Sequence, residues 1–192
     1  CPPCSDNLLE LLLMLDIARG AGAKSVHAVI PYFSYARSDK KDAPRISIAG
    51  RLIADLLVTS GADHVLTMTL HSPQVHGFFS VPADHLTAHS VFVNHLKQQD
   101  LSNTVVVSPD IGHAKRASKL ARAPQLPIAA AEEMRPTDDA VEVSGIMGDV
   151  RGKRAIVIDD EIATGGSIVG TIAHLRQEDV THVTVVVTHG LF

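Results

Sequence analysis

The sequence predicts an α/β fold with largely parallel sheets, because segments of strand and helix character alternate along nearly all of its 192 residues. Two valine-rich runs, residues 105–107 and 183–187, fit strands that are buried on both faces. Polar clusters follow several of the predicted strands, and in parallel sheets ligands gather at the carboxyl ends of strands. The length allows one large domain or two small ones, each with its own core.

The first predicted element is a leucine-rich helix that runs to about Arg19 and stops at Gly20 and Gly22. Its candidate N-caps are Ser5, Asp6 and Asn7. The spacing of Asn7 and Glu10 is that of a capping box, so we expect the helix to begin after these polar residues.

The rest of the first half contains a predicted strand at 25–30, a helix at 48–59 and a strand at 64–69. The polar loop at 31–45 is longer than a simple connection needs, which indicates a functional or mobile segment. A loop-like passage at 81–84 predicts a domain boundary between residues 83 and 84.

The second half repeats the alternation. Helices are predicted at 91–98, 114–123 and 168–176, and strands at 104–107, 128–131, 155–158 and 182–188. A polar excursion from 132 to 139 separates two of these strands, which is a suitable place for a flap. Arg135 is its one cation that could meet phosphate oxygens.

The most informative segment, residues 155–167, runs from an apolar strand into two acids, a Thr-Gly-Gly-Ser turn and a helix. Main-chain N–H groups of such a turn lie at the positive end of the helix dipole and favour a phosphate. Asp159 and Asp160 can accept hydrogen bonds from sugar hydroxyls or hold Mg²⁺, while Thr164 and Ser167 add hydroxyl donors. A five-carbon sugar phosphate fits these groups. The alternative is an ordinary acidic turn, which leaves the cost of two adjacent acids after an apolar strand unexplained.

Three further clusters have both a functional and a structural interpretation. Residues 32–42 mix aromatic and charged side chains, which suits a purine and polyphosphate or simply a solvated loop. His71 follows a predicted strand as a metal or phosphate ligand, or as an ordinary surface histidine among the 11 of the chain. Asp110 suits Mg²⁺ and would look the same in sequence as a helix cap.

Composition argues against several classes of function. A net charge of −4 gives no general attraction to nucleic acid or anionic membranes, and no apolar run has the length of a membrane span. The N-terminus lacks the features of a signal peptide, so the cytoplasm is the expected location. Cys1 and Cys4 form a C-x-x-C pair without the context of a redox or zinc site. The missing initiator Met and the abrupt end at Phe192 suggest a piece of a longer chain.

Taken in order, the segments resemble the ribose-phosphate pyrophosphokinase family over nearly the whole chain. The segments that carry the resemblance are residues 6–12, 30–37, 61–68, 70–71, 77–79, 107–110, 148–150 and 188–190. The resemblance implies two phosphoribosyltransferase-like α/β domains, both incomplete here. Residues 1–83 would be the ATP side and residues 84–192 the ribose 5-phosphate side.

The implied reaction moves the diphosphoryl group of MgATP to the anomeric hydroxyl of ribose 5-phosphate, giving phosphoribosyl pyrophosphate and AMP for nucleotide biosynthesis. The implied cofactor is Mg²⁺, and the implied assembly is a homo-oligomer. The resemblance assigns ATP to Arg37, Ser38, Asp39 and Asp42, and the metal to His71 and Asp110. It assigns ribose 5-phosphate to Arg135, Asp159, Asp160, Ala163, Thr164, Gly165, Gly166 and Ser167, with Arg135 also as the catalytic residue of the flap.

The chain departs from the family pattern at four positions. Thr69 replaces a metal-side Asp, Glu133 a catalytic Lys, Ser38 a Gln and Ala163 an acid. The altered flap, with Glu133, favours a second hypothesis, a non-catalytic paralogue that binds nucleotide or sugar phosphate and regulates an active partner, whereas the intact segment from Asp159 to Ser167 favours an enzyme. A third hypothesis, a phosphoribosyltransferase, explains the Gly-rich loop but leaves residues 32–42 without a role. We expect the isolated 192-residue piece to be inactive, because missing edge strands would expose unpaired backbone.

Overall fold

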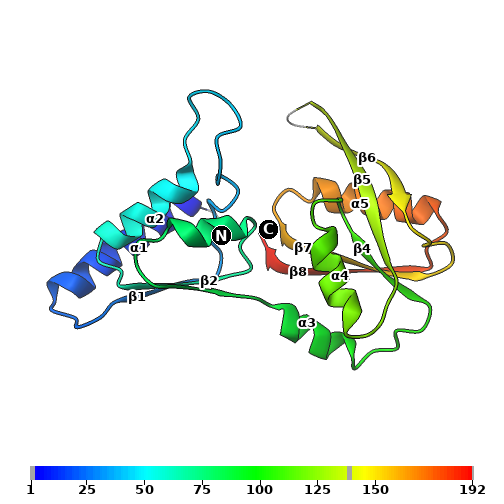
Figure 1. Cartoon of the computed structure of the whole chain (residues 1–192), viewed down its shortest axis with the longest axis horizontal. Helices are drawn as coiled ribbons and strands as arrows, with labels where there is room; N and C mark the ends of the chain where they lie inside the picture. The colour runs from blue at the N-terminus through cyan, green and yellow to red at the C-terminus, as the bar shows by residue number, and fades with distance from the viewer. Residues whose placement is uncertain (1–2, 138–139, 192) are drawn as a thin grey trace. The chain divides into compact units, whose positions relative to one another are not determined.

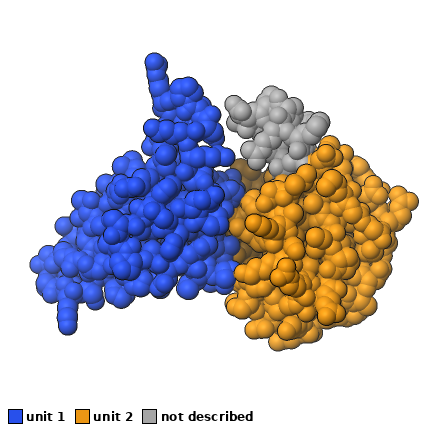
Figure 2. Space-filling view, in the orientation of Figure 1, with its two compact units in different colours: residues 1–87 blue, residues 88–192 orange. Residues whose placement is uncertain are grey.

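The computed structural model describes residues 3–137 and 140–191 (Figure 1), and of residues 133–137 and 140–142 it describes the backbone alone. The chain divides into two compact units, Cys1–Thr87 and Ala88–Phe192 (Figure 2). The boundary expected between residues 83 and 84 falls at the first residue of a strand, β3 (Ala83–Leu86), which pairs with β2 of the first unit.

Unit 1 is a parallel three-stranded sheet with two α-helices. Its elements are α1 (Cys4–Gly20), β1 (His27–Ile30), α2 (Ala49–Thr59), β2 (His64–Met68), the short 3₁₀ helix η1 (Pro73–Phe78) and β3, and the strand order is β1-β2-β3. The core lies between the helices and one face of the sheet, where Leu15, Leu57 and Val65 are buried with Ala28. β3 was missed in the sequence because it is short and its side chains alternate between exposed and half-buried.

Helix α1 begins earlier than expected, so the predicted capping box is wrong. The N-cap is Pro3, with no side-chain hydrogen bond to the helix, and Asp6 lies inside the first turn. Proline fixes φ in a range that suits a helix start, so the helix can begin ahead of the polar residues. The C-terminal end agrees with the sequence, because Gly22 adopts a φ of +83° and the N–H of Ala23 donates to the carbonyl of Ala18.

Unit 2 is a five-stranded sheet with helices on both faces. Its elements are α3 (His89–Leu96), β4 (Thr104–Ser108), α4 (Ala114–Arg122), β5 (Ile128–Thr137), β6 (Ala140–Met147), β7 (Arg154–Ile162), α5 (Gly166–Gln177) and β8 (His182–Gly190). The strand order is β6-β5-β4-β7-β8, and β6 alone of these runs antiparallel to its neighbour.

The central strand β4 is buried along its whole length, as the valine run predicted. Val106 packs with Leu120 of α4 on one face, while Val105 and Val107 pack with Leu175 of α5 on the other. Successive side chains of β4 thus pack into the cores on opposite faces of the sheet, which is why the sequence shows a continuous apolar run there.

Two strands of unit 2 are longer than the sequence indicated. β5 continues through residue 137 and β6 returns antiparallel to it, so the expected polar excursion is largely a β-hairpin. β7 continues to Ile162, which places Asp159 inside the strand, opposite Val187 of β8. Backbone pairing with neighbouring strands accounts for both extensions. Such pairing cannot be predicted from the side chains of the extended segments alone. Within the described part of the chain, no helix is both long and apolar enough to cross a membrane.

Candidate functional site

The turn between β7 and α5 is an open, glycine-based helix start. Gly165 is the N-cap of α5, with φ +80° and ψ 0°, and its carbonyl accepts the N–H of Val169 at 2.9 Å. Ala163, Thr164 and Gly166 are exposed. A Cβ placed on Gly166 would meet only the Thr164 hydroxyl oxygen, at 3.9 Å, so the backbone here is accessible. The first N–H groups of a helix have no partner within the helix and can bind an anion where the helix start is exposed, as it is here.

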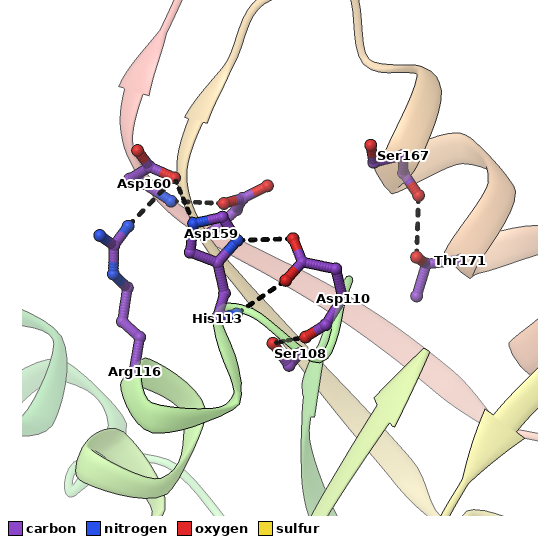
Figure 3. A network of polar contacts seen from close by, with 8 residues as sticks. All are labelled: Ser108, Asp110, His113, Arg116, Asp159, Asp160, Ser167 and Thr171. Atoms are coloured by element: carbon purple, nitrogen blue, oxygen red, sulfur yellow. Dashed lines mark hydrogen bonds and ion pairs between the residues drawn. The ribbon is translucent and has the colours of Figure 1, made fainter. Parts of the chain in front are cut away.

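Helix α5 is held firmly behind this turn. Ile168 and Thr171 are buried, and the Thr171 hydroxyl donates to the carbonyl oxygen of Ser167 at 2.8 Å (Figure 3). Ile168 packs into the core with residues of β4 and β7, which holds the first turn of α5 against the sheet.

Asp160 points away from solvent and pairs with a cation from α4. Its side chain is 1% exposed, and Nη1 of Arg116 lies 3.0 Å from its Oδ1. The same Nη1 is buried and has no well-directed hydrogen bond, so the contact is an ion pair rather than a directed bond. Nε2 of His113 lies 4.0 Å from the same oxygen. Asp160 is thus compensated by protein cations.

Asp159 is half-buried beside this pair, and its Oδ1 accepts the backbone N–H of Asp160 at 2.8 Å. Burial, a side-chain hydrogen bond with Asp160 and repulsion from its carboxylate raise the pKa of Asp159 to about 7, although the bond from the Asp160 backbone N–H acts in the opposite direction. The nearby His113 opposes this shift. Asp159 therefore carries a carboxylate whose negative charge the surrounding protein compensates poorly.

Asp110 follows β4 and is held at both oxygens by His113 (Figure 3). Oδ1 accepts the His113 backbone N–H at 2.7 Å, and Oδ2 lies 2.6 Å from Nδ1 of its ring. Burial alone would raise the pKa of Asp110, but the bonds to His113 outweigh it and hold this pKa below its usual value. The bond to Asp110 in turn raises the pKa of His113. A backbone hydrogen bond from Gly112 lowers the pKa of Asp110 further, so Asp110 shapes the turn before α4.

The donor set of unit 2 fits a divalent cation such as Mg²⁺. Asp110 and Asp159 offer carboxylate oxygens, the ligands that Mg²⁺ prefers. The raised pKa of Asp159 is the signature of a carboxylate that an added positive charge would stabilise. His71 belongs to unit 1, where it follows β2 and is half-buried.

Two residues of this cluster, His113 and Arg116, were not singled out from the sequence. His113 stands three residues after Asp110, and Arg116 three residues after His113, which puts both at the start of α4. Their spacing was visible, but their link to Asp160 depends on β4 and β7 being neighbours in the sheet.

The predicted nucleotide residues lie in unit 1, between β1 and α2. Ser38 has a structural role, because its hydroxyl accepts the Ala49 N–H at 2.9 Å and donates to the Ser47 carbonyl at 3.1 Å. Arg37 and Asp42 are exposed, and Asp39 is half-buried.

The aromatic residues of this segment divide into two groups. Phe33 is buried and packs edge-on against Phe79, so it belongs to the core. Tyr32 and Tyr35 are half-buried.

Thr69 has an unusual backbone for a β-branched residue, with φ +46°. Its N–H donates to the Leu86 carbonyl at 2.8 Å, and the next N–H, of Leu70, donates to the His85 ring at 2.9 Å. These bonds fix the backbone that leads to His71. Glu133 and Arg135 lie in β5, and their side chains lie outside the described residues.

Comparison with known proteins bears on the whole chain. The model of the N-terminal domain of ribose phosphate pyrophosphokinase matches residues 1–61, and that of the phosphoribosyl transferase domain matches residues 88–190. Ribose-phosphate pyrophosphokinases from Deinococcus radiodurans and Clostridium acetobutylicum are 54% and 45% identical over 99% and 100% of this chain. The chain spans 60% of the length of each.

A crystal structure of phosphoribosylpyrophosphate synthetase from Mycobacterium smegmatis superimposes with a TM-score of 0.90 at 37% identity, covering 98% of this chain and 62% of that one. The expected fold of two phosphoribosyltransferase-like domains is thereby confirmed. The chain belongs to the ribose-phosphate pyrophosphokinase family.

Proposed function

We propose that the full-length protein transfers the diphosphoryl group of ATP to the anomeric hydroxyl of ribose 5-phosphate. The hydroxyl oxygen forms a bond to the β-phosphorus, the bond from that phosphorus to the oxygen of the α-phosphate breaks, and the hydroxyl proton is released. The products are phosphoribosyl pyrophosphate and AMP. The names of the relatives and the family membership support this reaction, and the open Gly165 turn carries it.

The sugar phosphate would bind at the start of α5. Thr164 and Gly166 are exposed, and the main-chain N–H groups over residues 164–167 would bind the phosphate, which the helix dipole favours there. Asp159 would accept a hydrogen bond from a ribose hydroxyl. Asp160 would belong to the same sugar site, where its ion pair with Arg116 holds it in place. Ala163 leaves one contact fewer than an acid would make, and Arg135 would reach the phosphates from the flap.

Mg²⁺ would be held by Asp110 and His71, and ATP by Arg37, Ser38, Asp39 and Asp42. When bound, Mg²⁺ would neutralise phosphate oxygens and so ease attack on the β-phosphorus. Ser38 would contribute mainly by fixing the base of its loop. The remaining acceleration would come from holding the two substrates in line. We place this activity in the cytoplasm and in a homo-oligomer.

A regulatory paralogue is the second candidate, favoured by Glu133 at the place of the family's catalytic Lys. A negative side chain there would repel the charge that spreads over the phosphates. Such a protein would keep the sugar phosphate site and lose turnover.

The deciding experiment supplies full-length protein with MgATP and ribose 5-phosphate and follows AMP. AMP that forms only when the sugar is present supports the transferase. Saturable sugar binding without AMP supports the regulator. Asp159→Asn should weaken sugar binding by about 1–3 kcal/mol, the range for a buried polar group that loses its partner. Unchanged binding in this variant would remove Asp159 from the site.

A further inference from the structure

Three residues that can serve metal chemistry meet at the amino ends of the unit 1 sheet. His27 is the first residue of β1, His64 is the first residue of β2, and Asp84 lies in the neighbouring strand β3. The amino ends of parallel strands lie opposite the carboxyl ends, where His71 follows β2. The proposed reaction uses none of these three residues.

The sheet register brings the two histidines together. His27 and His64 are direct partners in the parallel ladder, so their side chains leave the same face of the sheet from neighbouring strands. Their ring centroids lie 5.1 Å apart at an interplanar angle of 54°, which is not a stacked arrangement. Tilted rings at this separation can turn one nitrogen each toward a common point, and a metal–imidazole bond is about 2.0–2.1 Å long.

Asp84 fixes the histidine on the central strand. Its Oδ2 lies 3.0 Å from Nε2 of His64, and Leu66, two residues after His64, is the ladder partner of Asp84. Asp84 therefore shares the face of both histidines. A carboxylate only accepts hydrogen bonds, so in the neutral ring the proton lies on Nε2 and Nδ1 keeps its lone pair. A carboxylate that orients a histidine in this way is the usual partner of a metal-bound imidazole.

Within the described residues, this face of the sheet is exposed. His27 and Asp84 are exposed, and the His64 side chain is 27% exposed. The adjacent acid Asp63 is engaged elsewhere, because its carboxylate binds Arg19 and the Val26 N–H. Water can complete the coordination of an ion held by two histidines at a surface.

We propose that His27 and His64 form a binding site for a transition-metal dication such as Ni²⁺ or Zn²⁺, with Asp84 as the residue that orients His64. Imidazole ligands suit these ions, whereas Mg²⁺ prefers carboxylate oxygen. The ion would link β1, at the edge of the described sheet, to the central strand β2. Because the metal would bind the folded state, it would raise the stability of unit 1.

Calorimetric titration of the full-length protein with NiCl₂ in excess Mg²⁺ tests the site, since Mg²⁺ occupies carboxylate sites. His27→Ala and His64→Ala should each weaken Ni²⁺ binding by about tenfold or more, and Asp84→Asn by about tenfold. His182→Ala is the matched control, because His182 is likewise exposed at the first residue of a strand, in unit 2. It should bind Ni²⁺ like the wild type.

Histidine proton resonances give a readout that does not depend on affinity. Substoichiometric Ni²⁺ should broaden the ring signals of His27 and His64 first, and Ni²⁺ should raise the melting temperature of the wild type but not of His27→Ala. Equal Ni²⁺ affinity in the wild type and both histidine variants would overturn the proposal, as would an equal loss in His182→Ala. An unchanged affinity in Asp84→Asn would overturn the role of Asp84.

Discussion

Arg116 and Asp160 form an ion pair in which the guanidinium Nη1 lies 3.0 Å from Oδ1, and the Asp160 side chain is 1% exposed. The pair joins α4 to β7 at the carboxyl ends of the neighbouring strands β4 and β7 (Figure 3). Removing one member of such a pair leaves a buried charge without compensation, which costs more than the pair itself contributes.

Arg116→Met should therefore lower the free energy of unfolding by on the order of 3 kcal/mol, measured by urea denaturation at neutral pH. The double variant Arg116→Met with Asp160→Asn should recover part of this loss, because no buried charge remains. Arg151→Met is the control, since its pair with Glu178 is exposed and should change stability by about 1 kcal/mol or less. Equal losses in Arg116→Met and Arg151→Met would contradict the buried pair.

The raised pKa of Asp159 predicts a specific pH dependence of stability. Its ordinary value is 3.8, and in the folded protein it is about 7. Between about pH 4 and pH 7 the folded state therefore binds more protons than the unfolded state at this residue, so its contribution to stability falls as pH rises through this window. Asp159→Asn, which cannot ionise, should gain stability relative to the wild type between pH 5 and pH 8.

The size of this gain is limited to about 1.4 kcal/mol for each pH unit of the window. Asp149→Asn serves as the control, because its bond to Lys153 lowers the pKa of Asp149. Asp149 is therefore ionised in both states throughout this window, and its substitution should change stability equally at pH 5 and pH 8. Urea denaturation at both pH values measures the two differences. If the difference in free energy of unfolding between Asp159→Asn and the wild type is the same at pH 5 and at pH 8, Asp159 is not a poorly compensated carboxylate.

The left-handed conformation of Gly165 predicts that a side chain there is costly. Gly165→Ala should lower stability by about 1–2 kcal/mol, because φ +80° strains any residue with a Cβ. It should also weaken ribose 5-phosphate binding, because the main-chain N–H groups would shift.

Gly20→Ala is the matched control for this substitution, since Gly20 lies in a helix with open space around its Cβ position. It should leave sugar binding unchanged and keep or slightly raise stability. Urea denaturation measures the stability of both variants, and calorimetric titration measures their affinity for ribose 5-phosphate. Sugar binding that survives intact in Gly165→Ala would place the phosphate elsewhere.

Glu133→Lys tests whether the flap sequence limits turnover. If the flap closes over the phosphates, a cation at position 133 should stabilise the developing negative charge and raise kcat for AMP release by about tenfold, since single charge contacts of this kind are worth at least that much. The control is Glu132→Lys, one residue earlier in β5. A rate that is unchanged or lower in Glu133→Lys would argue against this role.

The sequence predicted the order of elements around the candidate site because they are contiguous in the chain. Residues 155–167 carry strand, acids, turn and helix start in one stretch, and in the structure β7, which contains Asp159, is followed by Gly165 at the start of α5. The buried valines of β4 were equally clear, since a strand covered on both faces must be apolar throughout. The start of α1 was predicted too late, because the helix begins directly after Pro3, ahead of the polar residues that were expected to cap it.

The sequence by itself thus determined the α/β class, the family and the position of the glycine turn, all of which depend on residues close together in the chain. Only the tertiary structure decided that Asp160 is buried against Arg116 and that His27 lies beside His64. Each of these contacts depends on which strands are neighbours and in what register, and that choice is made by packing and backbone pairing across the whole sheet.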